Sequence, residues 1–207
     1  GLESSNDLIR EFCVNKCLPI ELFAKAIKLL KEYNISPTAY VTLGKPFIND
    51  WINIIDAVES IKFAFYHGAD RVVLLRLGIQ PNSLVEWLYD HKLYNPIEIW
   101  AMIEVLKMLP LELRKKEVLI ADPRLPKHLE VRECPCAQTA MELLNEYKGT
   151  LEYSYIEAID MLSCSHKETW YEKLEREKKL AVSIKSQIIE SYNRWLEVWQ
   201  NEHGEIL

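Results

Sequence analysis

The spacing of apolar residues predicts two helices and two strands in alternation near the start of the chain. A helix is expected over 19–35, where the apolar residues share one face: Ile20, Phe23, Ile27 and Leu30. The β-branched and aromatic run at 38–43 predicts a strand. The helical period returns over 50–68, which ends at a glycine suited to a helix C-terminus. Residues 72–77 predict the second strand.

This alternation of helix and strand with short connections is typical of a parallel sheet with crossover helices, and therefore of an α/β fold. The second strand contains the almost continuous apolar run "RVVLL", as expected of a strand that is buried on both faces. Two strands can neither close a barrel nor form a stable open sheet. We therefore expect them to belong to a larger α/β domain.

The rest of the chain is predicted to be mostly helical. Helices are expected over 83–91 and 96–109, and a third strand is expected over 117–121. Pro110 is a reasonable domain boundary. One long helix is predicted from 167 to 199, because apolar residues form a continuous stripe along it. The stripe indicates docking against the body of the protein or, alternatively, a coiled-coil partner.

Charge and hydropathy exclude two classes of protein. The net charge of −6 over 207 residues argues against a surface that is basic throughout. No apolar run approaches the ~20 residues that span a bilayer, and no signal-peptide pattern is present, so we expect a cytoplasmic protein without a membrane partner. Six basic and three acidic residues stand between 114 and 132. Arg124, Lys127 and Arg132 could there contact phosphate, or form a solvated loop.

Several motifs resemble the second half of a radical S-adenosylmethionine (SAM) barrel. They are "GLESSNDLI", "YVTLGKPF" and "RVVLLRLGIQPNSLVEWL", in this order. The resemblance is greatest to the branch that includes the radical-SAM subunit of archaeosine synthase; the elongator catalytic subunit is more distant. It implies an α/β fold in which residues 1–110 form the C-terminal half of a partial TIM barrel. Residues 111–207 follow as a mostly helical tail, which a zinc ion could hold together.

In this family the barrel strands end in loops that bind SAM. The resemblance implies that Glu3 and Ser4 lie at the end of the fourth strand and reach the ribose or methionine part of SAM. Lys45 and Gln80 would follow the fifth and sixth strands and face the same pocket. Each residue also has a local explanation: Glu3 and Ser4 can cap a helix, and Lys45 and Gln80 can belong to turns.

One part of the family pattern is missing. These enzymes bind a 4Fe–4S cluster through Cys-x-x-x-Cys-x-x-Cys, whereas Cys13 and Cys17 have no third cysteine at the required spacing. We expect both to be ordinary residues beside a helix. Because the chain begins with glycine, we expect the first half-barrel and the cluster ligands upstream. This chain alone should then be inactive, since SAM is not cleaved without the cluster.

Two pairs of soft metal ligands stand about thirty residues apart in the tail: Cys134 with Cys136, and Cys164 with His166. Such a set can close a tetrahedral zinc site of the Cys₃His type. Free thiols in a reducing cytosol are the alternative, and a second iron–sulfur cluster is disfavoured by the histidine. A zinc site here would hold the basic segment against the start of the long helix, and in a tRNA-modifying enzyme this combination suggests a tRNA-contacting module.

The resemblance implies a fragment of a radical SAM enzyme that modifies tRNA and takes part in archaeosine formation. The family chemistry uses a 5′-deoxyadenosyl radical, which acts on a lysine-adducted deazaguanine base supplied by a partner transferase. The alternative is a non-catalytic, metal-stapled binding or assembly module derived from a radical SAM protein.

Overall fold

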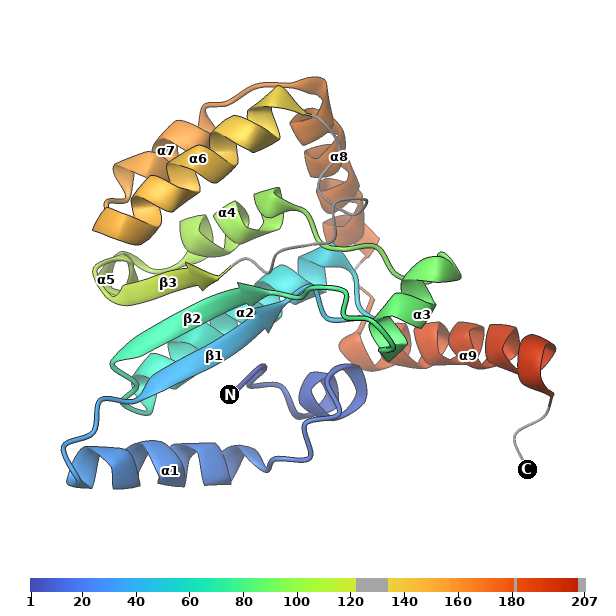
Figure 1. The fold of residues 1–207 in the computed structure, drawn as a ribbon, viewed down its shortest axis with the longest axis horizontal. Coiled ribbons are helices and arrows are strands. Elements are labelled where there is room, and N and C mark those ends of the chain that lie inside the picture. Colours follow the sequence, from blue (N-terminus) through green and yellow to red (C-terminus); the bar gives the residue numbers. More distant parts are fainter. Residues whose placement is uncertain (122–133, 181, 205–207) are drawn as a thin grey trace.

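The structure is a computed structural model that describes residues 1–121, 134–180 and 182–204. It has an α/β architecture, with a small parallel sheet and a larger number of helices (Figure 1). The strands are β1 (Thr38–Leu43), β2 (Arg71–Arg76) and β3 (Glu117–Ala121), and they lie in the order β1-β2-β3. Both pairings are parallel, with Val41 opposite Leu74 and Leu74 opposite Ile120. The expected α/β class is thus confirmed.

One face of the sheet forms the main core with α2 (Asp50–Tyr66) and α4 (Ile99–Met108), which also pack on each other. Alternate strand residues point into this core: Ala39, Val41, Leu43, Val72, Leu74, Val118 and Ile120. Because side chains alternate along a strand, Tyr40, Leu75 and Leu119 point to the other face. These three apolar residues are exposed or half-buried, whereas Thr42 and Val73 on the same face are buried. Helices therefore cover one face of the sheet more completely than the other.

The helices predicted in the first half of the chain are present. They are α1 (Ile20–Glu32), α2, α3 (Leu84–Asp90) and α4. The last of these begins at Ile99, three residues after the predicted start at Pro96. A short π-helix, η1 (Ile9–Cys13), precedes α1. The apolar face of α1 packs through Phe23 and Ile27 into the main core.

Beyond the expected boundary at Pro110, the chain first returns to the sheet. A short helix, α5 (Leu111–Arg114), leads into β3, which pairs with β2. Two helices, α6 (Pro135–Thr150) and α7 (Ser154–Asp160), then pack on each other and on α4. Across the described residues, no helix combines the length and the apolar character needed to cross a bilayer.

The prediction of one long helix from 167 to 199 was wrong. The structure has two helices, α8 (Ser165–Leu180) and α9 (Ile184–His203). Ser183 is extended and its side chain accepts a hydrogen bond from the backbone N–H of Ser186, which is the geometry of a helix start. The apolar stripe is divided accordingly. Trp170 and Leu174 of α8 pack in the main core, whereas the apolar residues of α9 pack in a separate cluster around Ile188.

A second core lies where α9 meets η1, α3 and the loop after β1. Its buried members are Ile9, Cys13, Phe47, Ile52, Ile79, Leu88, Tyr94 and Ile188. Tyr192 and Trp195 of α9 pack against it. The tail thus docks on the body of the protein, as predicted, but through two separate apolar clusters.

Candidate functional site

The first three residues lie beside β1. Glu3 forms a parallel bridge with Val41. The backbone N–H groups of Leu2 and Glu3 donate to the Tyr40 carbonyl (3.0 and 2.8 Å), and the N–H of Thr42 donates to the Glu3 carbonyl (3.1 Å). This pairing places Glu3 next to the carboxyl-terminal half of β1, at the edge of the sheet where parallel strands end.

The Glu3 carboxylate is held by two neighbours. Thr42 Oγ1 donates to Glu3 Oε2 (2.5 Å), and Lys16 Nζ donates to Glu3 Oε1 (3.1 Å). The side chain keeps 16% of its surface exposed. A carboxylate offers about four acceptor positions, so Glu3 can accept a further hydrogen bond from a ligand.

Ser4 and Lys45 meet at a third residue, Asp56, which the sequence analysis did not identify. Ser4 Oγ donates to Asp56 Oδ1 (2.6 Å), and Lys45 Nζ forms an ion pair with Asp56 Oδ2 (2.8 Å). Lys45 also donates to the Thr42 carbonyl. All three side chains are buried. Ser4 and Lys45 therefore use their polar groups inside the protein in this structure.

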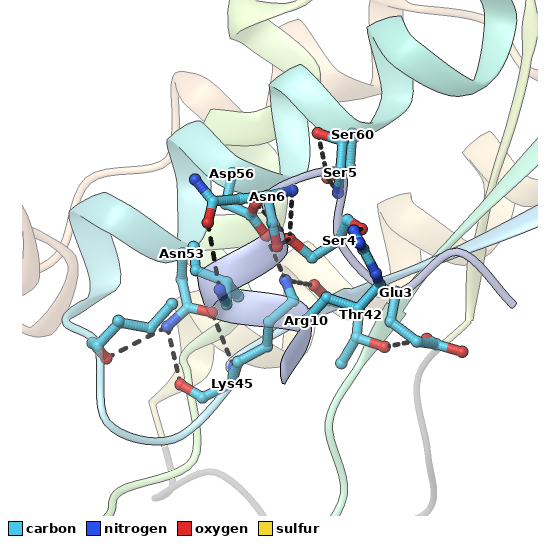
Figure 2. Close-up of polar contacts among 12 residues, drawn as sticks. Glu3, Ser4, Ser5, Asn6, Arg10, Thr42, Lys45, Asn53, Asp56 and Ser60 are labelled. Atoms are coloured by element: carbon cyan, nitrogen blue, oxygen red, sulfur yellow. Dashed lines mark hydrogen bonds and ion pairs between the residues drawn. The ribbon is translucent and has the colours of Figure 1, made fainter. Parts of the chain in front are cut away.

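A polar stripe on the buried face of α2 organises both loops at this sheet edge (Figure 2). Asn53 Oδ1 accepts from the backbone N–H groups of Gly44 (3.0 Å) and Lys45 (2.7 Å). Ser60 Oγ accepts from the N–H of Ser5 (2.7 Å), and Asp56 lies between them along the helix. The spacing 53, 56, 60 is a helical one, so polar residues on this otherwise apolar face were a signal available in the sequence.

Arg10 closes the loop after Glu3 and was also missed. Its guanidinium donates to the carbonyls of Ser4 (3.2 Å) and Leu18 (2.8 Å) and pairs with Asp7. The Arg10 side chain is buried except for a small fraction of its surface. An arginine within an apolar segment gives no indication of these partners, because they lie on both sides of it in the chain.

Gln80 is not part of this network. It is exposed in the loop after β2, and its backbone carbonyl accepts a hydrogen bond from Ser83 Oγ (2.6 Å). Ser83 is the N-cap of α3. The structure therefore brings Ser4 and Lys45 together, with Glu3 nearby. It places Gln80 in the turn that leads into α3.

A hollow of about 460 Å³ opens beside the turn that contains Lys45. Charged residues of α2, α8 and α9 line it: Asp50, Lys173, Glu177, Glu190 and Arg194. Lys173 pairs with Asp50 (2.8 Å), and burial raises the pKa of Glu177. The volume falls in the usual range for ligand sites, roughly 300–1,000 Å³. Glu3 and Ser4 are not among its lining residues.

The tail cysteines form a compact group of possible metal ligands. The sulfur atoms of Cys134, Cys136 and Cys164 lie within 4.8 Å of one another, and those of Cys134 and Cys164 are 3.3 Å apart. His166 is not in this group. Its Nε2 instead lies 3.1 Å from Oε2 of Glu98, at the start of α4. Burial raises the pKa of Glu98, and the nearby His166 acts in the opposite direction.

The other residues singled out in the sequence are two further cysteines and three basic residues. Cys13 is buried in the second core, and this burial raises its thiol pKa to about 12. Cys17 is exposed in the loop before α1. Arg124, Lys127 and Arg132, proposed as phosphate contacts, lie outside the described residues.

Comparison with known proteins gives distant homologues. The chain is 27% identical over 182 residues to archaeosine synthase subunit beta of Methanosarcina acetivorans. The aligned region covers 86% of this chain and 50% of that protein. The protein of the same name from Thermococcus kodakarensis is 29% identical over 123 residues, 59% of this chain and 37% of its own length.

An uncharacterized protein of Methanocaldococcus jannaschii is 26% identical over 189 residues, which is 89% of this chain and 50% of that protein. The chain thus spans about half the length of these first relatives or less. No protein-family model matches it, and no solved structure matches it.

Proposed function

We propose that this chain is part of a radical SAM enzyme that takes part in forming archaeosine in tRNA. The observation that carries the proposal is the similarity to archaeosine synthase subunit beta, which extends over 86% of the chain in one relative. The name of that relative describes it as a subunit. We therefore propose that a second protein takes part, and that this protein is the transferase that supplies the lysine-adducted base. The substrate of the assembly is tRNA.

The uneven covering of the sheet supports a half-barrel. In a (β/α) barrel, helices surround the outside and strand side chains fill the inside. Here α2 and α4 pack on one face, whereas Tyr40, Leu75 and Leu119 lie on the other and are exposed or half-buried. Parallel sheets are normally buried on both faces. The three strands also follow one another in parallel in chain order, as consecutive barrel strands do, and Glu3 adds one parallel bridge to β1.

Glu3 is the residue best suited to bind SAM, because barrel enzymes place their sites at the carboxyl ends of the strands. Its partly exposed carboxylate can accept from a ribose hydroxyl or an ammonium group. Ser4 and Lys45 are buried on Asp56, and we assign them the role of holding the Glu3 loop and the loop after β1. SAM and a 4Fe–4S cluster would supply the radical chemistry. The cluster ligands would come from outside these residues, which contain no Cys-x-x-x-Cys-x-x-Cys.

Deletion of the gene for the full-length protein tests the proposal. We expect archaeosine to disappear from the tRNA of the host and the lysine-adducted base to accumulate, as measured by mass spectrometry of tRNA nucleosides. A plasmid copy should restore archaeosine. A copy that carries Glu3→Gln should restore an archaeosine content at least about tenfold lower than the unmodified copy does. The amide lacks the negative charge of the carboxylate and has one acceptor oxygen fewer.

Glu11→Gln is the matched control, since Glu11 is an exposed acid in η1, and it should restore archaeosine fully. An unchanged archaeosine content after the deletion would contradict the proposed function. Equal rescue by the Glu3 and Glu11 variants would contradict the role of Glu3 alone.

A further inference from the structure

We infer that Cys134, Cys136 and Cys164 bind a single zinc-class ion, and that His166, oriented by Glu98, supplies the fourth ligand. The inference rests on the geometry of the tail and is independent of the proposed archaeosine function. It also adds a geometric argument for zinc over an iron–sulfur cluster, which the histidine among the ligands already disfavoured.

The sulfur separations are those of ligands to one ion. A tetrahedral zinc with Zn–S bonds of about 2.3 Å places its sulfurs about 3.8 Å apart. The three sulfurs here lie within 4.8 Å of one another, and the closest pair is 3.3 Å apart. Small side-chain adjustments therefore complete the geometry. The cysteines of a 4Fe–4S cluster bind different iron atoms, so their sulfurs stand farther apart than ligands to one ion.

Two helix starts converge on the three thiols. Cys134 is the N-cap residue of α6, Cys136 lies in its first turn, and Cys164 directly precedes α8. The backbone N–H of Lys167 points to the Cys164 sulfur at 3.5 Å. Helix N-termini favour negative charge. The two helix starts therefore stabilise the proposed centre, because a zinc ion with three thiolates and one neutral imidazole carries a net charge of −1.

Lys167 fixes the path of the chain into Cys164. Its side chain is nearly buried, and its ammonium donates to the carbonyls of Asp160 (2.5 Å) and Leu162 (2.8 Å). These carbonyls belong to the last residue of α7 and to the segment between α7 and α8. The contacts of Lys167 thus hold the segment that carries Cys164 in place without involving the Cys164 thiol.

His166 and Glu98 have the arrangement of a metal ligand and its supporting carboxylate. Histidines that bind metals usually donate their second ring N–H to a carboxylate. His166 Nε2 lies at an ion-pair distance of 3.1 Å from Glu98 Oε2, a buried oxygen that has no hydrogen-bond partner among the described residues. The other nitrogen, Nδ1, is buried and has no hydrogen-bond partner among the described residues. A movement of this side chain toward the thiols is needed to complete the site, since His166 lies outside the sulfur group.

A centre of this kind would join α6 and α8 to the start of α4, where Glu98 is the N-cap residue. The contact between the tail and the sheet domain would then depend on the ion as well as on apolar packing. Removal of the ion by a chelator should lower the thermal midpoint of the chain.

The test is the metal content of the 207-residue chain, purified under reducing conditions. We expect one zinc per chain and no acid-labile sulfide, by elemental analysis and sulfide assay. Cys164→Ser should lower zinc affinity at least tenfold, whereas Cys17→Ser, at an exposed cysteine outside the group, should leave it unchanged. Circular dichroism confirms that each variant is folded. Stoichiometric iron and sulfide, or no bound metal in the unmodified chain, would overturn the inference.

Cobalt(II) as a probe tests the fourth ligand. The unmodified chain should give thiolate charge-transfer bands and the intense ligand-field bands of a tetrahedral ion. His166→Ala should shift the ligand-field bands, whereas His203→Ala, at an exposed histidine of α9, should not. Glu98→Gln should keep the spectrum but weaken binding by about 10–100-fold. An unchanged spectrum in His166→Ala would overturn the assignment of the fourth ligand.

Discussion

A carboxylate in the protein interior is stable only when its charge is compensated and its oxygens are hydrogen-bonded. In Asp56 the charge is compensated by an ion pair between Oδ2 and the Lys45 ammonium, and Oδ1 accepts a hydrogen bond from Ser4. The same carboxylate therefore connects the loop after residues 1–3 with the loop after β1. Asp56 thus contributes, with Asn53 and Ser60 of the same helix, to positioning the two halves of the candidate site.

Substitution of Asp56 by Asn should lower the free energy of unfolding by about 3–5 kcal/mol, because the Lys45 ammonium stays buried without a counter-ion. Asp70→Asn is the control. Asp70 pairs with Lys31 at the surface, where both side chains are more than a third exposed, and exposed pairs contribute about 0–1 kcal/mol. Urea unfolding of both variants measures the difference. Equal effects would show that the buried pair has no special role.

The element that depends most closely on its sequence is the turn from β1 into α2. Gly44 has a φ of +90°, and a Cβ at this position would lie 2.7 Å from Cγ2 of Ile97. The Gly44 carbonyl accepts from the Tyr94 hydroxyl (2.8 Å), and its N–H donates to Asn53. The motif "LGKPF" thus has a structural reason for its glycine, apart from any ligand.

Gly44→Ala should destabilise the protein by about 1–3 kcal/mol, since the left-handed backbone and the contact with Ile97 both oppose a methyl group. Gly149→Ala, in α6, is the matched control: nothing lies within 4 Å of its added Cβ. This change should stabilise the helix by about 0.5–1 kcal/mol. Thermal unfolding should therefore move in opposite directions for the two variants. A lower midpoint for both would contradict the argument.

At the scale of the molecule, the tail is attached through two apolar clusters. Trp170 and Leu174 of α8 pack in the main core. On α9, the ring centroid of Tyr192 lies 4.4 Å from that of Phe47. The Tyr192 hydroxyl donates to the Phe12 carbonyl (2.7 Å). The second cluster therefore joins α9 to η1 and to the loop after β1, beside the site where we propose that SAM binds.

Tyr192→Ala should lower the free energy of unfolding by about 2 kcal/mol, less than for a fully buried aromatic residue because Tyr192 is half-buried. Ile189→Ala, on the same helix but 49% exposed, should change it by no more than about 0.5 kcal/mol. Chemical denaturation measures both values. If the two variants were equally stable, α9 would not depend on the aromatic contact.

Local periodicity determined most of the elements. The helices near 20–32 and 50–66 and the strands at 38–43 and 117–121 follow from the spacing of apolar residues, because that spacing reflects which side of each element is buried. The break between α8 and α9 escaped this reasoning. The apolar spacing continues across it, and a serine gives only a weak signal for a new helix start.

Only the tertiary structure decided how the site is assembled. Ser4, Lys45 and Asp56 are separated by up to 52 residues in the chain, and the packing of α2 on β1 brings them together. The three cysteines were identifiable from their residue type and spacing, but the pairing of His166 with Glu98 depends on how α8 meets α4. Periodicity reports the burial of a residue within its own element. The partner of a buried polar group comes from another element, and its position is set by packing.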